Sequence, residues 1–328
     1  MIKYSLIEHI HLSRLDIESE EYSLEYYYSA QENNAPNAVK EGIKEYGLLY
    51  PPVLIYGSDR YRVVIGKRYI DIYKKLKKDI PYALLIEKPE GKYSRYDFLK
   101  FLIHLKNAIA GFNVVEKSIA YKKLFDLNGN VDNDILRILK IPRIEEIIKN
   151  YLKLACAPEN IKTLILSGRL NELTAFEIFN CAEKDWELLA LFIADVFLGT
   201  KKRNKLISMI HDISQRNGTD IENIIENNEV KNIFNLRIDP PHIGEKIFNH
   251  FERQRYPFIY QYRERFYKKL KEVGLENSSR FIVPKDFEDW EFKLVFPFSS
   301  VKDFIKKVDK LKKIGESRPF DELMKLRK

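Results

Sequence analysis

The sequence has 328 residues, enough for two or three domains that each bury a core, and its 45% hydrophobic and 32% charged residues exclude an intrinsically disordered chain. Its 56 Lys and Arg residues against 48 Asp and Glu give a net charge of +8, which permits nucleic-acid binding without requiring it. The two cysteines, Cys156 and Cys181, have no partner at a metal-ligand spacing, and no segment has the pattern of a signal peptide or a membrane span. We therefore expect a cytoplasmic protein with reduced thiols, no bound metal and no membrane partner.

The first part of the chain predicts a strand and then a helix. Residues 1–15 have the pattern of a short strand followed by a turn, whereas residues 16–36 are acidic and aromatic and match no element. Val39, Ile43 and Tyr46 recur at helical spacing, and Gly47 can end that helix in the left-handed conformation.

A hairpin followed by a helix and a further strand is predicted between residues 47 and 86. Two β-rich runs, 53–56 and 61–65, flank a Gly-Ser-Asp turn, and the second run ends in Gly66-Lys67-Arg68 before an amphipathic helix. A helix N-terminus presents unpaired N–H groups, and glycine lets a ligand approach the backbone closely. Gly66, Lys67 and Arg68 are therefore candidate anion-binding residues, although the same pattern is also typical of a structural corner with solvated cations.

Two short helices joined by a tight turn are predicted farther along. Asp132 is a candidate N-cap for a helix that ends at Leu139, and Ile141-Pro142 separates it from a second helix that ends near Leu154. The second helix should turn Ile144, Ile147, Ile148, Tyr151 and Leu152 inward. Its expected outward residues are of types that contact phosphates and base edges: Arg143, Lys149, Asn150 and Lys153. Glu145 and Glu146 oppose phosphate binding, so a packed helix pair with a solvated face stays an alternative to a helix-turn-helix on double-stranded DNA.

The rest of the chain predicts more helices and a small mixed unit. Gly168 has the position of a helix C-cap, and Asp239-Pro240-Pro241 marks a boundary. Beyond it we expect a helical region broken at Pro257, strands at 281–283 and 292–296, and a final helix capped by Ser299-Ser300. This small unit is a candidate dimerisation module.

The order of these segments resembles the ParB-like partition proteins, whose N-terminal fold is shared with sulfiredoxin. The resemblance lies in Gly-Leu-Leu-x-Pro-Pro-Val-Leu, Val-Ile-Gly-Lys-Arg-Tyr and Ile-Pro-Tyr-Ala-Leu-Leu around the hairpin, and in residues 157–175 after the helix pair. It covers about residues 1–215. It implies an α/β ParB/sulfiredoxin-like domain at 1–115, an all-α domain with a helix-turn-helix at 116–238, and an α+β module at 239–328.

In that family two sequence boxes bind CTP and its metal. Gly66 and Arg68 match the first box, and Asn107, Asn113 and Glu116 match the second. Lys67 and Lys106 replace the two box glutamates, Tyr69 replaces an arginine, and the second-box arginine is Ala110 or a neighbour. Loss of both carboxylates removes the hard oxygen ligands that Mg²⁺ needs and any base for hydrolysis. We therefore expect Gly66, Lys67, Arg68 and Asn107 to bind an anion, CTP included, without Mg²⁺ and without CTP hydrolysis.

Taken together, the sequence predicts a homodimeric ParB-like protein that binds double-stranded DNA and acts in chromosome or plasmid partition or in regulation. One alternative is an enzyme on the same fold, nuclease-like or a nucleotide-dependent small-molecule kinase, which the missing carboxylates oppose. Another is a non-catalytic scaffold, which Glu145 and Glu146 favour. No catalytic residue can be assigned, because no Ser-His-Asp or P-loop constellation is present in the sequence.

Overall fold

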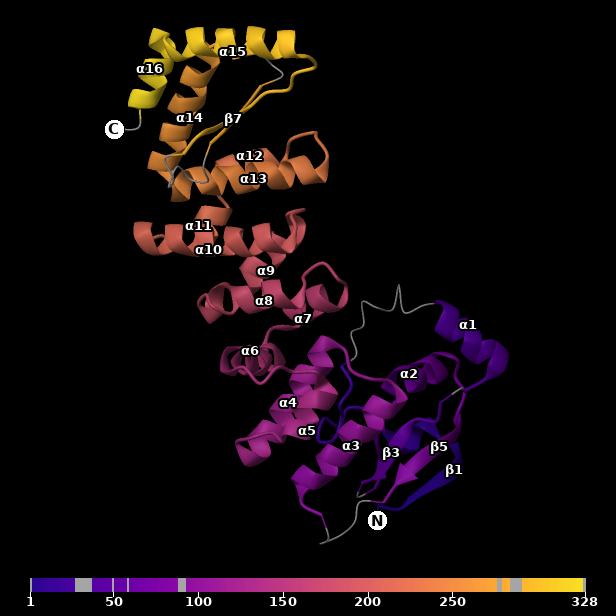
Figure 1. Ribbon diagram of the computed structural model, residues 1–328. Coiled ribbons are helices and arrows are strands. Elements are labelled where there is room, and N and C mark those ends of the chain that lie inside the picture. Colours follow the sequence, from indigo (N-terminus) through magenta and orange to yellow (C-terminus); the bar gives the residue numbers. More distant parts are fainter. Residues whose placement is uncertain are drawn as a thin grey trace. The chain divides into compact units, whose positions relative to one another are not determined.

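The computed structural model describes residues 2–26, 37–48, 50–57, 59–87, 93–275, 279–283 and 291–326. The chain forms two compact units, Met1–Ile207 and Ser208–Lys328 (Figure 1). The first unit contains the sheet and the helices that follow it up to the first half of α10 (Thr200–Asn217). The predicted domain boundaries at 115/116 and 238/239 stay predictions.

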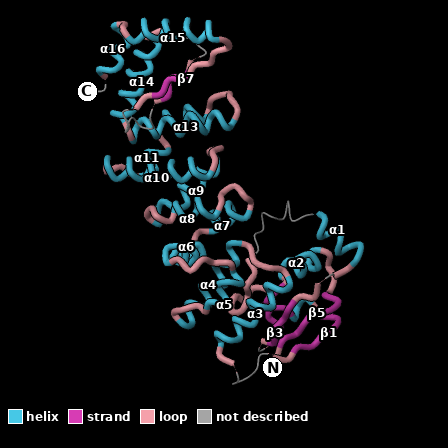
Figure 2. Tube along the Cα trace, in the orientation of Figure 1, coloured by secondary structure: helices cyan, strands magenta, loops and turns pink. Residues whose placement is uncertain are grey.

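A five-stranded mixed sheet begins the first unit, in the order β1-β5-β3-β4-β2. Figure 2 shows three of these strands, β1, β5 and β3, side by side. The strands are β1 (Tyr4–Ile10), β2 (Leu15–Asp16), β3 (Val53–Tyr56), β4 (Tyr61–Ile65) and β5 (Ile80–Ile86). Strand β3 lies at the centre, antiparallel to β4 and parallel to β5, and it is fully apolar where it is buried. The predicted hairpin is confirmed, and it closes where the backbone N–H of Gly57 donates to the carbonyl of Arg60 at 2.9 Å.

Two helices accompany the sheet, α1 (Asn37–Tyr46) and α2 (Lys67–Lys75). Helix α1 ends as predicted, since Gly47 has φ +78° and its N–H donates to the carbonyl of Ile43 at 3.0 Å. Ile43, Ile70 and Tyr73 are buried with strand residues in one hydrophobic core. The apolar face of each helix is thus used against the sheet, and the charged face of α2 is left for other contacts.

Helices make up the remainder of the first unit. They are α3 (Arg95–Ile109), α4 (Val114–Asn128), α5 (Asn133–Leu139), α6 (Glu145–Cys156), α7 (Glu159–Leu166), α8 (Glu172–Ile178) and α9 (Trp186–Asp195). The C-cap of helix α4 is Gly129, with φ +68°. Gly168 follows α7 with φ +74°, as its predicted role at a helix C-terminus requires.

The second unit is a helical array with one strand pair. Its helices after α10 are α11 (Ile221–Ile225), α12 (Asn228–Phe234), α13 (Pro240–Arg255), α14 (Pro257–Glu272), α15 (Val301–Gly315) and α16 (Arg318–Lys325). Strands β6 (Arg280–Ile282) and β7 (Lys293–Val295) pair antiparallel. The break at Pro257, both strands and the cap at Ser300 are confirmed, whereas α16 was not predicted. Phe266, Val273 and Leu323 form a buried apolar cluster in this unit.

None of the helices in the described part of the chain combines the length and the apolar character that crossing a bilayer requires.

Candidate functional site

The corner between β4 and α2 is built around a glycine that no other residue can replace without strain. Gly66 is the N-cap of α2 and has φ +100°, in the left-handed region that L side chains rarely adopt. A Cβ atom at Gly66 would lie 2.9 Å from the Cα of Pro52. The predicted strand–glycine–helix junction is therefore confirmed, and it leaves backbone N–H groups at the start of α2 without acceptors inside the helix.

A carboxylate from the N-terminal segment occupies this corner. The backbone N–H groups of Gly66 and Lys67 donate to the same oxygen of Glu25, Oε2, at 2.8 and 2.9 Å. The side chain of Lys67 is turned away and lies 3.2 Å from Glu20 Oε1. An anion thus sits where the unpaired N–H groups and the dipole of a helix favour one, and the chain itself supplies it.

Lys106, which replaces a box glutamate, is a buried cation held by the chain. Its side chain is 3% exposed, and Nζ donates to Glu116 Oε2 at 3.1 Å and to the carbonyl of Gly111 at 3.0 Å. Glu116 in turn forms a reciprocal capping box with Asn113 at the start of α4. Its other oxygen, Oε1, accepts the backbone N–H of Tyr26 at 3.3 Å. The second box is therefore an internal charge pair that joins α3, α4 and the N-terminal segment.

These groups surround a cavity of about 400 Å³. Its polar lining includes Glu25, Gly66, Arg68, Lys106 and Glu116. Arg68 belongs to this lining, and among the described residues its buried Nε atom has no hydrogen-bond partner. A buried donor without an acceptor is costly, so this guanidinium, unlike the ammonium of Lys106, is available to pair with an anionic oxygen.

Burial is the main influence on the ionisation of Glu25. It raises the pKa of this carboxyl, while the N–H groups of Gly66 and Lys67 and the ammonium of Lys106 act in the opposite direction. The ionised carboxylate is thus held at a desolvation cost that its hydrogen bonds only partly offset.

The predicted anion-binding residues divide between the cavity and its surroundings. Gly66 and Arg68 line the cavity, and Lys67 contributes its backbone N–H. Asn107 is exposed and is absent from the lining, because neighbouring helical residues point about 100° apart and Lys106 takes the inward position. Glu25 was missed: it lies in the acidic segment that matches no sequence pattern, and no local signal places it beside Gly66.

Within the described ranges, no group of three or more His, Cys, Asp and Glu side chains is placed to hold a metal ion.

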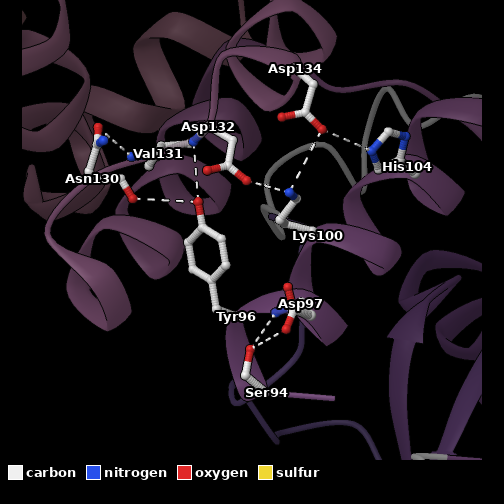
Figure 3. Close-up of polar contacts among 9 residues, drawn as sticks. All are labelled: Ser94, Tyr96, Asp97, Lys100, His104, Asn130, Val131, Asp132 and Asp134. Atoms are coloured by element: carbon white, nitrogen blue, oxygen red, sulfur yellow. Dashed lines mark hydrogen bonds and ion pairs between the residues drawn. The ribbon is translucent and has the colours of Figure 1, made fainter. Parts of the chain in front are cut away.

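The predicted helix pair is present as α5 and α6. Polar contacts hold α5 against α3 (Figure 3). Asp132 is the N-cap residue as predicted, but its carboxylate makes no cap hydrogen bond and pairs with Lys100 instead. The hydroxyl of Tyr96 accepts the backbone N–H of Asp132 at 3.2 Å, and Lys100 Nζ lies 3.9 Å from Asp134 Oδ2. The first helix of the pair is therefore oriented by α3, the helix that also carries Lys106.

The phase of α6 corrects two expectations about its faces. Asn150, predicted to point outward, is 6% exposed, because it lies one turn before the buried Leu154 on the inward face. Ile144, predicted to point inward, is 54% exposed, because it is the N-cap residue and precedes the helix.

Three basic residues of the pair differ in how freely they can reach a ligand. Arg143 is exposed, and Lys149 is exposed with Nζ 2.6 Å from Glu145 Oε1. Lys153 is half-buried and donates to the carbonyl of Phe179 at 2.7 Å. Arg143 and Lys149 are thus accessible, as are Arg137 and Lys140 of the first helix and the acidic Glu145 and Glu146.

Comparison with known proteins gives a relative in sequence. No family model matches the chain. A probable chromosome-partitioning protein ParB of Campylobacter jejuni is 22% identical over 205 residues, which cover 62% of this chain and 70% of the relative. The fold and the corner at Gly66 define an α/β protein whose sheet is followed by a helical region. The predicted resemblance to ParB-like partition proteins is confirmed at the level of sequence similarity.

Solved ParB structures are also similar over much of their length. The Caulobacter crescentus ParB bound to a centromeric parS site is 17% identical, with 62% of this chain and 98% of that chain covered at a TM-score of 0.34. The same protein complexed with CTP-gamma-S gives 17% identity, 58% and 97% coverage and a TM-score of 0.23. A pNOB8-like ParB N-domain is 15% identical with 76% and 98% coverage and a TM-score of 0.33. These TM-scores are low, so the sequence similarity carries the assignment.

Proposed function

We propose that this chain is a DNA-binding protein that acts in DNA segregation or regulation and binds duplex DNA as a homodimer through the α5–α6 pair. The observation that carries the proposal is the similarity over 205 residues to a probable chromosome-partitioning protein. The helix pair supports it, since short helices joined by a tight turn are a common way to enter the major groove, and Arg143 and Lys149 are exposed on this pair.

The accessible charges of the pair suit phosphate contacts. The Lys149–Glu145 ion pair is exposed on both sides, with side chains 65% and 83% accessible, and such pairs contribute little to stability. The ammonium of Lys149 can therefore exchange its carboxylate partner for a DNA phosphate at little cost. Arg143, at the start of the second helix, has the fork of donors that reads guanine edges. Buried Asn150 is not available for such a contact.

The test is duplex binding by the intact chain, followed by fluorescence anisotropy over a range of salt concentrations. We expect binding that weakens steeply with salt, with a slope in log K against log salt of about −0.9 for each phosphate neutralised. Selection from random duplexes should give a site with two-fold symmetry, as a dimeric reader requires. If the chain binds no duplex at low salt, the helix pair is structural and the scaffold alternative replaces the proposal.

We also propose that the cavity at Gly66 binds a phosphate-bearing anion, CTP among the candidates, without hydrolysing it. The support is the guanidinium of Arg68 in the lining, the N–H groups at the start of α2 and a volume of about 400 Å³. The acids that remain, Glu25 and Glu116, are engaged by N–H groups and by Lys106. We expect no CTP turnover with Mg²⁺; turnover that disappears in Arg68→Ala would contradict this proposal.

A further inference from the structure

Residues 22–26 of the N-terminal segment form a strap at the cavity, and its two ends are held by different kinds of contact. Tyr22 and Leu24 are 2% and 0% exposed, and the ring of Tyr22 packs edge-on against Phe98 at 5.4 Å. Beyond them, Glu25 accepts from the backbone of Gly66 and Lys67, the backbone N–H of Tyr26 donates to Glu116, and the ammonium of Lys162 lies 5.6 Å from the centre of the Tyr26 ring. The first part of this segment is therefore anchored by apolar burial, and its last two residues are held by polar contacts.

The strap connects the start of α2, at Gly66 and Lys67, with α4. Glu25 accepts from Gly66 and Lys67, while the backbone N–H of Tyr26 donates to Glu116. Lys123 of α4 donates to the carbonyl of Ser23 at 2.7 Å and also contacts the carbonyl of Glu20. A change at the corner would thus be transmitted to the position of the strap on α4.

An incoming phosphate and the Glu25 carboxylate need the same N–H groups. The two donors at the start of α2 converge on a single carboxylate oxygen, and a second anion that shared these donors would be repelled by the carboxylate. Burial raises the pKa of Glu25, so its carboxylate is held against a desolvation penalty. Arg68 lines the same cavity, so its guanidinium adds attraction for a ligand with more than one anionic oxygen.

We propose that Glu25 is an internal competitor for the anion pocket: a polyphosphate ligand displaces its carboxylate from Gly66 and Lys67 and thereby releases Tyr26 from Glu116. The proposal rests on the proposed anion-binding function of the cavity. Ligand binding and the position of the strap are therefore coupled in one equilibrium. In each of the two states the same N–H groups donate to a different anion.

The experiment measures binding of tripolyphosphate and of CTP, without metal, by calorimetry to the full chain and to three variants. Glu25→Ala removes the competitor, and we expect it to bind tripolyphosphate about ten- to a hundredfold more tightly than the unaltered chain, the range of a charge-assisted hydrogen-bonded pair. Glu21→Ala is the matched control, because it makes the same change in net charge but removes a carboxylate that pairs with Arg62 outside the cavity. Arg68→Ala in the Glu25→Ala background should abolish the gain. Comparison of CTP with tripolyphosphate shows whether the base adds affinity.

A second measurement needs no variant. Hydrogen exchange of the unaltered chain with saturating tripolyphosphate should expose the amide of Tyr26 while the amides of Gly66 and Lys67 stay protected. Equal affinity of the unaltered chain and Glu25→Ala, or unchanged protection of Tyr26 with ligand bound, would overturn the competition and leave the anion pocket standing. If no variant binds either ligand, the anion pocket itself is wrong and the competition falls with it.

Discussion

The cavity at Gly66 and the α5–α6 pair both carry basic residues, but in opposite physical states. In the cavity Lys106 is buried and bonded to Glu116, and the helix corner already holds an anion from the chain. On the helix pair Arg143 and Lys149 are exposed, and the one partner of Lys149 is itself exposed. The comparison shows that Lys106, at a position that resembles a nucleotide-binding box, contributes to the stability of the fold. Lys149, on a surface helix, is the lysine that is accessible to a ligand.

The largest effect is expected from breaking the buried pair. Lys106→Met leaves Glu116 buried without its cation, and we expect a loss of about 3–5 kcal/mol in the free energy of unfolding, measured by urea denaturation. Lys122→Met is the control, because its pair with Asp126 on α4 is partly exposed and should cost about 0–1 kcal/mol. Equal losses in the two variants would show that Lys106 is no more structural than a surface lysine.

A second difference concerns the backbone. Gly66→Ala places a Cβ 2.9 Å from Pro52 at φ +100°, and we expect a loss of about 3 kcal/mol. Gly129→Ala, just before the helix pair, also has a positive φ, +68°, but no atom lies within 4 Å of its Cβ, so about 1 kcal/mol is expected. Chemical denaturation of both variants measures the difference between their free energies of unfolding. A smaller loss for Gly66→Ala than for Gly129→Ala would mean that the backbone around Gly66 and Pro52 shifts to accommodate the Cβ atom.

The two regions should also respond to pH with opposite signs. Glu25 has a pKa raised above 4.5 by burial, so its ionisation lowers stability at neutral pH and that penalty disappears as the pH falls through the raised value toward 4.5. The stability of the unaltered chain relative to Glu25→Gln should therefore increase as the pH is lowered. Glu145 has a pKa lowered by its hydrogen bond with Lys149, so relative to Glu145→Gln the unaltered chain should lose stability below 4.5. Unfolding midpoints at several pH values test both signs, and changes of the same sign would contradict the contrast.

The smallest effect is expected from a single surface lysine. Lys149→Ala should leave thermal stability unchanged, lower duplex affinity for all sequences alike and reduce the salt slope by about 0.9, the value for one phosphate contact. Lys325→Ala is the matched control, since it has the same spacing to its partner Asp321 on a helix of the second unit. A change of slope in both variants would indicate non-specific charge rather than contact through the helix pair.

The sequence by itself determined the features that depend on neighbours along the chain. The hairpin, the left-handed ends at Gly47 and Gly168, the break at Pro257 and the two short helices follow from turn residues and helical periodicity, which act over a few residues. The candidate corner at Gly66 could be predicted for the same reason, because glycine between a strand and a helix has a local meaning.

Only the tertiary structure decided which partners these local features have. Glu25 reaches the N–H of Gly66 across 41 positions of sequence, and Lys106 is buried because the capping box of α4 presents Glu116 to it. The inward position of Asn150 likewise depends on the rotation of α6 about its axis. Packing against α4 and α8 sets this rotation, whereas the mixed pattern of polar and apolar residues in the sequence of α6 does not define it. Long-range contacts of this kind are selected by the packing of whole elements, so the residues that make them carry no signal in their own neighbourhood.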